Sequence, residues 1–91
     1  MKLPGLRSYC REWIVKEMVF KLKLSRTMTD CGLYDPAGEI LLRMKQSKRE
    51  AMNTFVHEIL HAIEDEYDLK LGHKIIDPLS EAIVRFLMDN F

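Results

Sequence analysis

The chain has 91 residues, of which 47% are apolar and 31% are charged. That length supports one compact domain and is too short for two lobes around a deep cleft, so we expect a single domain over residues 1–91 with a shallow site. The 14 basic and 14 acidic side chains cancel, so overall charge favours neither nucleic acid nor an anionic membrane as a partner.

The start of the chain and its cysteines indicate the compartment. Met1–Gly5 contains Pro and Gly before any apolar run, unlike a signal peptide, and no later apolar stretch approaches the roughly 20 residues that span a bilayer. Cys10 and Cys31 are too few and too widely spaced for a disulfide framework. We therefore expect a soluble cytoplasmic protein with reduced thiols.

The first half of the chain predicts a short helix, a strand and a hairpin. Apolar residues spaced by three and four favour a helix over residues 6–14, with Trp13 in the core. From Met18 to Ser25 apolar and polar side chains alternate, which is typical of a strand covered on one face. Residues 31–34 and 39–44 flank Asp35-Pro36-Ala37-Gly38, whose Pro and Gly suit the turn of a β-hairpin.

The second half predicts two helices. Ser47-Lys48-Arg49-Glu50 fits a capping box, so a long helix begins there and Gly72 is its expected stop. Its apolar stripe consists of Met52, Val56, Ile59, Leu60 and Ile63. Asp77 followed by Pro78 predicts the start of a final helix that runs to about Asn90. Its apolar face consists of Leu79, Ile83, Phe86 and Leu87.

Together these elements indicate an α+β fold, in which a small antiparallel sheet with a hairpin packs against the long helix and the C-terminal helix. We expect the strand Ile40–Arg43 at an edge of the sheet. An exposed edge could hold an extended peptide by strand addition, and it could equally pair with a second copy to form a homodimer.

The long helix carries His57-Glu58-Ile59-Leu60-His61. Residues four apart lie on the same side of a helix, so both imidazoles can bind one zinc ion at about 2.0–2.1 Å, and we expect them at the border of the buried face. Glu58 is close enough to act as a general base on a water molecule held by the metal. The non-functional alternative is an amphipathic helix whose polar residues line its solvated edge.

This motif, with an acidic residue on a following helix, resembles the zincin metallopeptidases. Glu81 follows His61 by twenty residues, which is similar to the gluzincin branch, where a glutamate on the next helix completes the zinc site. Glu81-Ala82 followed by Phe86 is also similar to ImmA/IrrE-type peptidases, and small phage-encoded zincin-like proteins match in length. The chain departs from the gluzincin Asn-Glu pair, because it has Ser80 before Glu81.

The third ligand therefore stays open between three residues. The resemblance favours Glu81, since two histidines and one carboxylate leave a fourth position for water. His73 is the second choice, because a loop histidine completes the site in SprT-like zincins, and Asp77 is the third. Asp65, one turn past His61, is expected to orient that histidine.

The sequence thus predicts a zinc-dependent endopeptidase that acts on a protein or peptide substrate, with Glu58 as the general base. The competing interpretation is a non-catalytic, zinc-binding regulatory module derived from a zincin fold.

Overall fold

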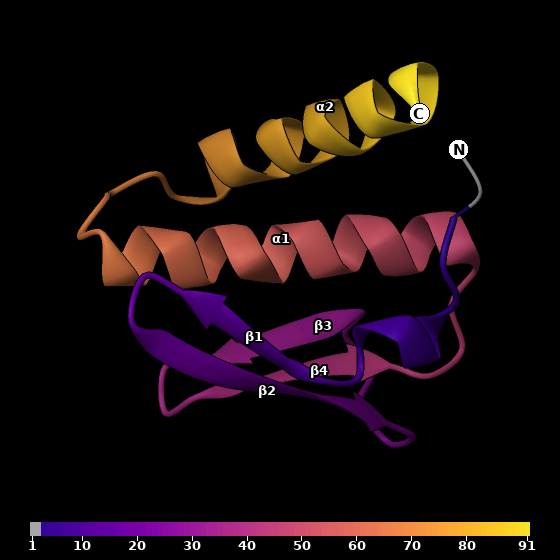
Figure 1. Cartoon of the computed structure of the whole chain (residues 1–91), viewed down its shortest axis with the longest axis horizontal. Helices are drawn as coiled ribbons and strands as arrows, with labels where there is room; N and C mark the ends of the chain where they lie inside the picture. The colour runs from indigo at the N-terminus through magenta and orange to yellow at the C-terminus, as the bar shows by residue number, and fades with distance from the viewer. Residues whose placement is uncertain (1–2) are drawn as a thin grey trace.

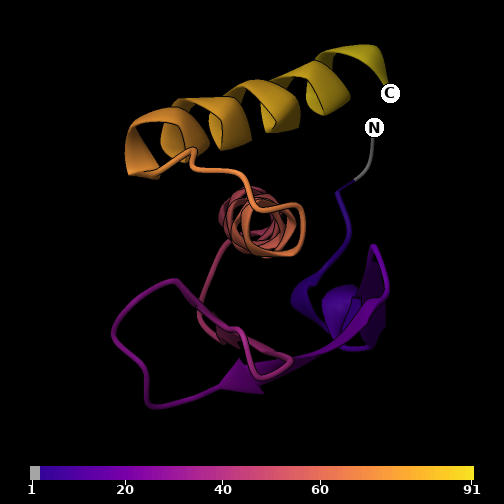
Figure 2. The same cartoon turned by 90° about the vertical axis from the view of Figure 1, so that its left-hand side faces the viewer.

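The computed structural model describes residues 3–91, and Met1 and Lys2, the first residues of the segment compared with a signal peptide, lie outside it. The elements in chain order are a 3-10 helix Leu6–Tyr9, strands β1 Glu12–Val15, β2 Met18–Ser25, β3 Gly32–Asp35 and β4 Glu39–Arg43, and helices α1 Lys48–Glu66 and α2 His73–Asn90. They form three layers, with α1 between the sheet and α2 (Figure 1). The end-on view in Figure 2 shows the same order of layers. The expected α+β class is confirmed.

The sheet is mixed, so the expected antiparallel sheet is wrong. Its strand order is β1-β2-β4-β3, and β2 pairs with β4 in parallel while the other two pairs are antiparallel. After β2 the chain crosses to the outer position as β3, and the hairpin then returns β4 into the gap beside β2. The hairpin itself is confirmed. Consequently β4 is central, and β3 occupies the edge that we expected for Ile40–Arg43.

The helix expected over residues 6–14 is also wrong, because only Leu6–Tyr9 is helical and β1 follows directly. Trp13 lies opposite Phe20 and Ile14 lies opposite Val19 in the β1–β2 ladder. Aromatic and β-branched residues favour such cross-strand pairs, and pairing with β2 outweighs the local helical spacing.

One face of the sheet supplies the core under α1. Alternation along β2 and β4 buries Phe20, Leu22, Ile40 and Leu42 completely or nearly so. Tyr34 of β3 packs against Phe20, with ring centroids 5.4 Å apart. The period-2 pattern predicted for residues 18–25 therefore identifies the buried face correctly.

Helix α1 begins as expected and ends earlier. The Ser47 hydroxyl accepts from the Glu50 N–H, and the Glu50 carboxylate accepts from the Ser47 N–H, so the capping box is confirmed. The helix ends at Glu66, whereas Gly72, with φ of +72°, is the N-cap of α2 and not a helix stop. In the predicted stripe, Met52 and Leu60 are buried, and Val56, Ile59 and Ile63 are half-buried.

Helix α2 begins at His73, four residues before the predicted Asp77 cap, and contains Pro78 in its interior. The Gly72 carbonyl accepts from the N–H groups of Ile75 and Ile76, which starts the helix. The residues that α2 buries are Ile76, Ser80 and Val84. Leu79 and Phe86 are exposed, so the predicted apolar face is wrong for these two and Phe86 is not in the core. Neither helix within residues 3–91 is long and apolar enough to cross a membrane.

Candidate metal centre

Three histidines from two helices converge between α1 and α2. His57 and His61 lie one turn apart in α1, and His73 is the first residue of α2. Each offers a ring nitrogen within 4.8 Å of the others. The Nε2 atoms of His57 and His61 are 3.1 Å apart. Both of these side chains are half-buried, as expected for residues at the border of the buried face.

This arrangement fits a tetrahedral zinc ion. Two nitrogen ligands at about 2.0–2.1 Å from zinc are separated by about 3.3 Å, which is close to the His57–His61 distance. His73 is the exposed member of the group, so its ring can rotate toward the other two imidazoles without disturbing the core.

A carboxylate faces the Nδ1 atom of each imidazole. Asp77 Oδ1 lies 3.3 Å from Nδ1 of His57 and 3.6 Å from Nδ1 of His73. Glu64 Oε1 lies 3.3 Å from Nδ1 of His61. A carboxylate that accepts from Nδ1–H fixes the tautomer and leaves Nε2 free for a metal. Of these contacts, the one between Glu64 and His61 is a hydrogen bond, whereas Asp77 lies near His57 and His73 at ion-pair distance.

Glu64 also fixes the turn between the two helices. Its Oε2 atom accepts from the backbone N–H of Leu71 at 2.7 Å and of Gly72 at 2.8 Å. The backbone N–H of Gly72, together with that of Leu71 and with His61, lowers the pKa of Glu64, although burial opposes this shift. One side chain thus orients His61 and holds the residue that precedes His73. An acidic residue one turn after the second histidine is the only sequence signal for this role, and our sequence analysis missed it.

Glu58 is buried beside the histidines, with 6% of its surface exposed. Burial raises the pKa of its carboxyl to about 7, while nearby His73 opposes the rise and Asp30 adds to it. Burial, together with His61 and His73, lowers the pKa of His57 although Asp77 opposes this. A neutral imidazole is the form that binds a metal, and a carboxyl with a pKa near neutrality suits proton transfer.

The edge strand β3 covers one side of the site. A Cβ atom on Gly32 would lie 2.5 Å from Cγ2 of Thr54 and 3.1 Å from Cγ of Glu58, so only glycine allows the strand to come this close to α1. Between strand and helices lies an open cleft of about 350 Å³. It is lined by Asp30, Gly32, Leu33, Tyr34, His57, Glu58, His61 and His73.

Two of the other predicted site residues lie elsewhere. Glu81 lines a separate depression with Ser47 and Asn53 near the start of α1. It follows His73 by eight residues, which is about 12 Å along a helix axis. Asp65 accepts a hydrogen bond from the Tyr34 hydroxyl at 2.8 Å, and Glu64, not Asp65, contacts His61. The structure therefore brings together His57, Glu58, His61, His73 and Asp77.

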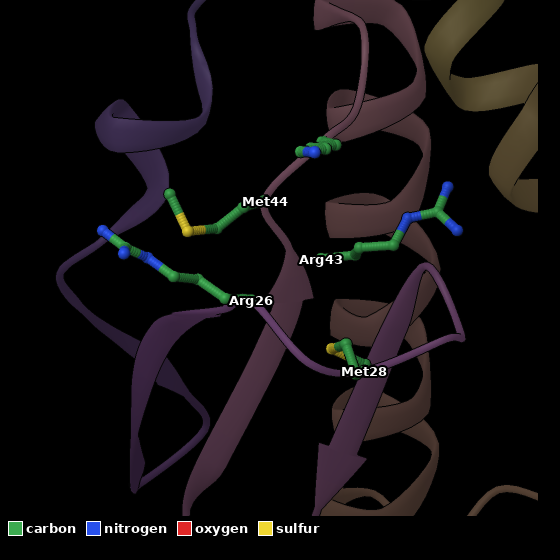
Figure 3. Close-up of a pocket in the computed structure, with 5 residues that line it drawn as sticks. Arg26, Met28, Arg43 and Met44 are labelled. Carbon is green, nitrogen blue, oxygen red and sulfur yellow. The ribbon is translucent and has the colours of Figure 1, made fainter.

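A larger hollow of about 540 Å³ lies away from the histidines. It is lined by Arg26, Met28, Arg43, Met44 and Lys45. Figure 3 shows that Arg26 and Arg43 point to opposite sides, so their guanidinium groups do not converge on one ligand. This hollow offers a weaker basis for function than the histidine cluster.

No known protein family, curated protein or solved structure matches this chain. The assignment of function consequently depends on the geometry of the site.

Proposed function

We propose that the protein is a zinc-dependent metallopeptidase in which His57, His61 and His73 bind the metal and Glu58 is the general base. The observation that carries this proposal is the convergence of three imidazoles beside a buried carboxyl. Among the third ligands left open by the sequence, proximity favours His73 over Glu81. Three protein ligands leave one position of a tetrahedral site open, which is typical of catalytic zinc.

Each residue has a separate task in peptide hydrolysis. Zinc, when bound, would supply Lewis acidity that polarises the substrate carbonyl and acidifies water. Glu58 would accept a proton from the attacking water and then deliver it to the amine leaving group. Asp77 and Glu64 would hold the imidazoles in the metal-binding tautomer. The burial of Glu58 keeps this proton transfer out of bulk solvent.

The substrate we propose is an extended stretch of polypeptide that pairs with β3. This strand has a neighbour on one side only, and its residues Gly32, Leu33 and Tyr34 line the cleft that contains Glu58. A peptide added to this edge would gain backbone hydrogen bonds and would pass over the histidines. Strand addition also supplies affinity to a domain that has no second lobe.

Metal content tests the ligand set. The wild type, dialysed against zinc and then against buffer, should retain about one zinc per chain by elemental analysis. His57→Ala, His61→Ala and His73→Ala should each lower the retained zinc strongly, whereas Glu81→Ala should retain it. If Glu81→Ala loses zinc and His73→Ala retains it, the third ligand is Glu81 and not His73. A wild type that retains no zinc would remove the basis of the proposal.

Cleavage of a peptide library tests the chemistry. Glu58→Gln preserves the shape of the side chain and removes the base, so this variant should bind zinc as the wild type does and lose about 100-fold or more in cleavage rate. Equal cleavage by the two proteins would show that Glu58 is not the base. Mass spectrometry of the products identifies the bonds that are cut.

Asp77 supports a second candidate function, a structural zinc site in a binding module. Its carboxylate lies close to both His57 and His73, and as a fourth ligand it would close the coordination shell. X-ray absorption at the zinc edge distinguishes the two cases, because an open site has three imidazoles and a water, whereas a closed site has a protein carboxylate. In the closed case Asp77→Asn should lose zinc, and in the open case it should weaken binding only moderately.

A further inference from the structure

The outer edge of β3 offers backbone groups to a further strand. The Arg43 N–H donates to the Cys31 carbonyl at 2.9 Å. Because backbone groups alternate along an antiparallel ladder, Leu33 also directs its N–H and C=O toward β4, whereas Gly32 and Tyr34 direct theirs away from β4. No described strand pairs with this edge. A bound peptide would therefore form its backbone hydrogen bonds with Gly32 and Tyr34.

The side chains of β3 alternate between two faces of the sheet. Tyr34 lies on the face toward α1, where its hydroxyl donates to Asp65, and a Cβ on Gly32 would point to the same helix. Leu33 lies on the opposite face, which neither helix covers (Figure 2), and 50% of its surface is exposed. Its cross-strand neighbour on this face is the half-buried Leu41. The two leucines form an apolar pair that ends at the open edge.

We propose that Leu33 is a specificity-determining residue, which selects an apolar side chain close to the bond that is cut. A peptide strand alternates its side chains as β3 does, so the residue opposite Leu33 lies on the open face in either strand direction. In the antiparallel direction this residue belongs to a pair without mutual hydrogen bonds, in which the Cα atoms are about 4.5 Å apart. Its side chain would extend the apolar row that Leu41 and Leu33 begin.

Glu58 relates this contact to the bond that is cut. A Cβ on Gly32 would lie 3.3 Å from Oε1 of Glu58, so the peptide residue opposite Gly32 passes close to the proposed general base. The next peptide residue, opposite Leu33, therefore lies beside the cut bond or one residue away from it. The inference rests on the proposed function for this step, whereas binding alone measures the contact with Leu33. Cross-strand apolar pairs favour their partners by about 2- to 5-fold, so we expect a preference and not an absolute requirement.

Cleavage of a peptide library, with the products identified by mass spectrometry, tests the proposal. The wild type should prefer an apolar residue by about 2- to 5-fold at one fixed position near the cut bond. Leu33→Glu should retain zinc and prefer Lys or Arg at that position, because opposite charges favour a cross-strand pair. The matched control is Ile14→Glu, an exposed apolar site on the other edge strand, which should cut as the wild type does. The same preference in Leu33→Glu and the wild type would overturn the proposal.

A binding measurement separates this inference from the proposed function. If the wild type shows no cleavage that depends on Glu58, the proposed function fails and binding decides the inference. The probes are blocked nonapeptides of alternating Thr and Gln that differ only in the central residue, which is Val, Lys or Glu. In an NMR titration of Glu58→Gln, the Val peptide should shift the amide signals of Gly32 and Tyr34 and bind about 2- to 5-fold more tightly than the others. Adding Leu33→Glu should make the Lys peptide the tightest.

Two results of this titration would overturn the inference. The first is equal binding of the three peptides, or binding without a shift at β3, because Leu33 would then select nothing. The second is a set of β3 shifts that follow the protein concentration and not the peptide, which would assign the edge to a second copy of the chain.

Discussion

Glu64 connects the histidine-bearing face of α1 to the turn that precedes α2. It contacts Nδ1 of His61 with one oxygen and the N–H groups of Leu71 and Gly72 with the other. We predict that Glu64→Ala weakens zinc binding about 10- to 100-fold, because both the tautomer of His61 and the position of His73 lose their support. Competition with a zinc chelator of known affinity measures the change.

A control separates this effect from general damage to the fold. Asp65→Ala removes the neighbouring carboxylate, which contacts Tyr34 and not a histidine. This variant should bind zinc within a few-fold of the wild type. An equal loss of affinity in both variants would assign the effect to the end of α1 as a whole.

Gly32 permits the close approach of β3 to α1. Gly32→Ala would place a methyl group against Thr54 and Glu58, so we predict a loss of about 1–3 kcal/mol in the free energy of unfolding. Urea denaturation measures it. Gly5→Ala is the matched control, because no atom lies within 4 Å of its added Cβ, and it should be neutral. A neutral Gly32→Ala would mean that β3 can move away from α1.

Residue types and spacing identify part of the site and leave the rest open. His57 and His61 follow from a spacing of four on a well-capped helix, and the structure places their Nε2 atoms together. The contribution of His73 could not be derived, because it depends on the turn of residues 67–72, whose geometry is fixed by Glu64 through hydrogen bonds to the backbone. Glu81 was favoured from a resemblance in spacing, which says nothing about where α2 begins.

At the scale of elements, the capping box of α1 gives a prediction about pH. Hydrogen bonds from Ser47 lower the pKa of Glu50 below its ordinary value of 4.5. Because the folded pKa is the lower one, the ionised carboxylate stabilises the fold above about pH 4.5, and this contribution is lost as pH falls through the folded pKa. Glu50→Gln should therefore lower the melting temperature at about pH 7, and the difference should shrink towards pH 3.5.

Scanning calorimetry at several pH values measures this dependence. The control is Glu17→Gln, an exposed acid in the β1–β2 turn, whose melting temperature should follow that of the wild type throughout. A difference for Glu50→Gln that stays constant with pH would show that shape, and not charge, accounts for the effect.

Local signals predicted elements well where the sequence had no competing choice. The alternation of β2, the hairpin turn and the start of α1 are set by neighbours in sequence, and all three are confirmed. The parallel β2–β4 pair could not be predicted, because it depends on a crossover through β3 that no local pattern encodes. The early start of α2 was missed for a related reason, since Asp77 is an acceptable helix cap by sequence and lies beside two histidines in space.

In the layered arrangement, a metal ion bound between α1 and α2 would act on the stability of the whole molecule. Helix α2 packs on α1, and the Ser80 hydroxyl lies within hydrogen-bond distance of the backbone and side-chain oxygens of Asn53. The three histidines come from the same two helices and lie close together. A metal ion bound there would cross-link α2 to α1.

We predict that zinc raises the melting temperature in proportion to its binding. Free zinc at about 100 times its dissociation constant adds about 2.7 kcal/mol to the free energy of unfolding. For a domain of this size, this corresponds to a rise of roughly 10–20 °C in the melting temperature. Differential scanning fluorimetry with a chelator and with zinc measures the shift. His73→Ala should retain the chelated melting temperature and lose most of the shift, because an exposed ring contributes little without metal. An unchanged shift in this variant would show that zinc binds without joining α2 to α1.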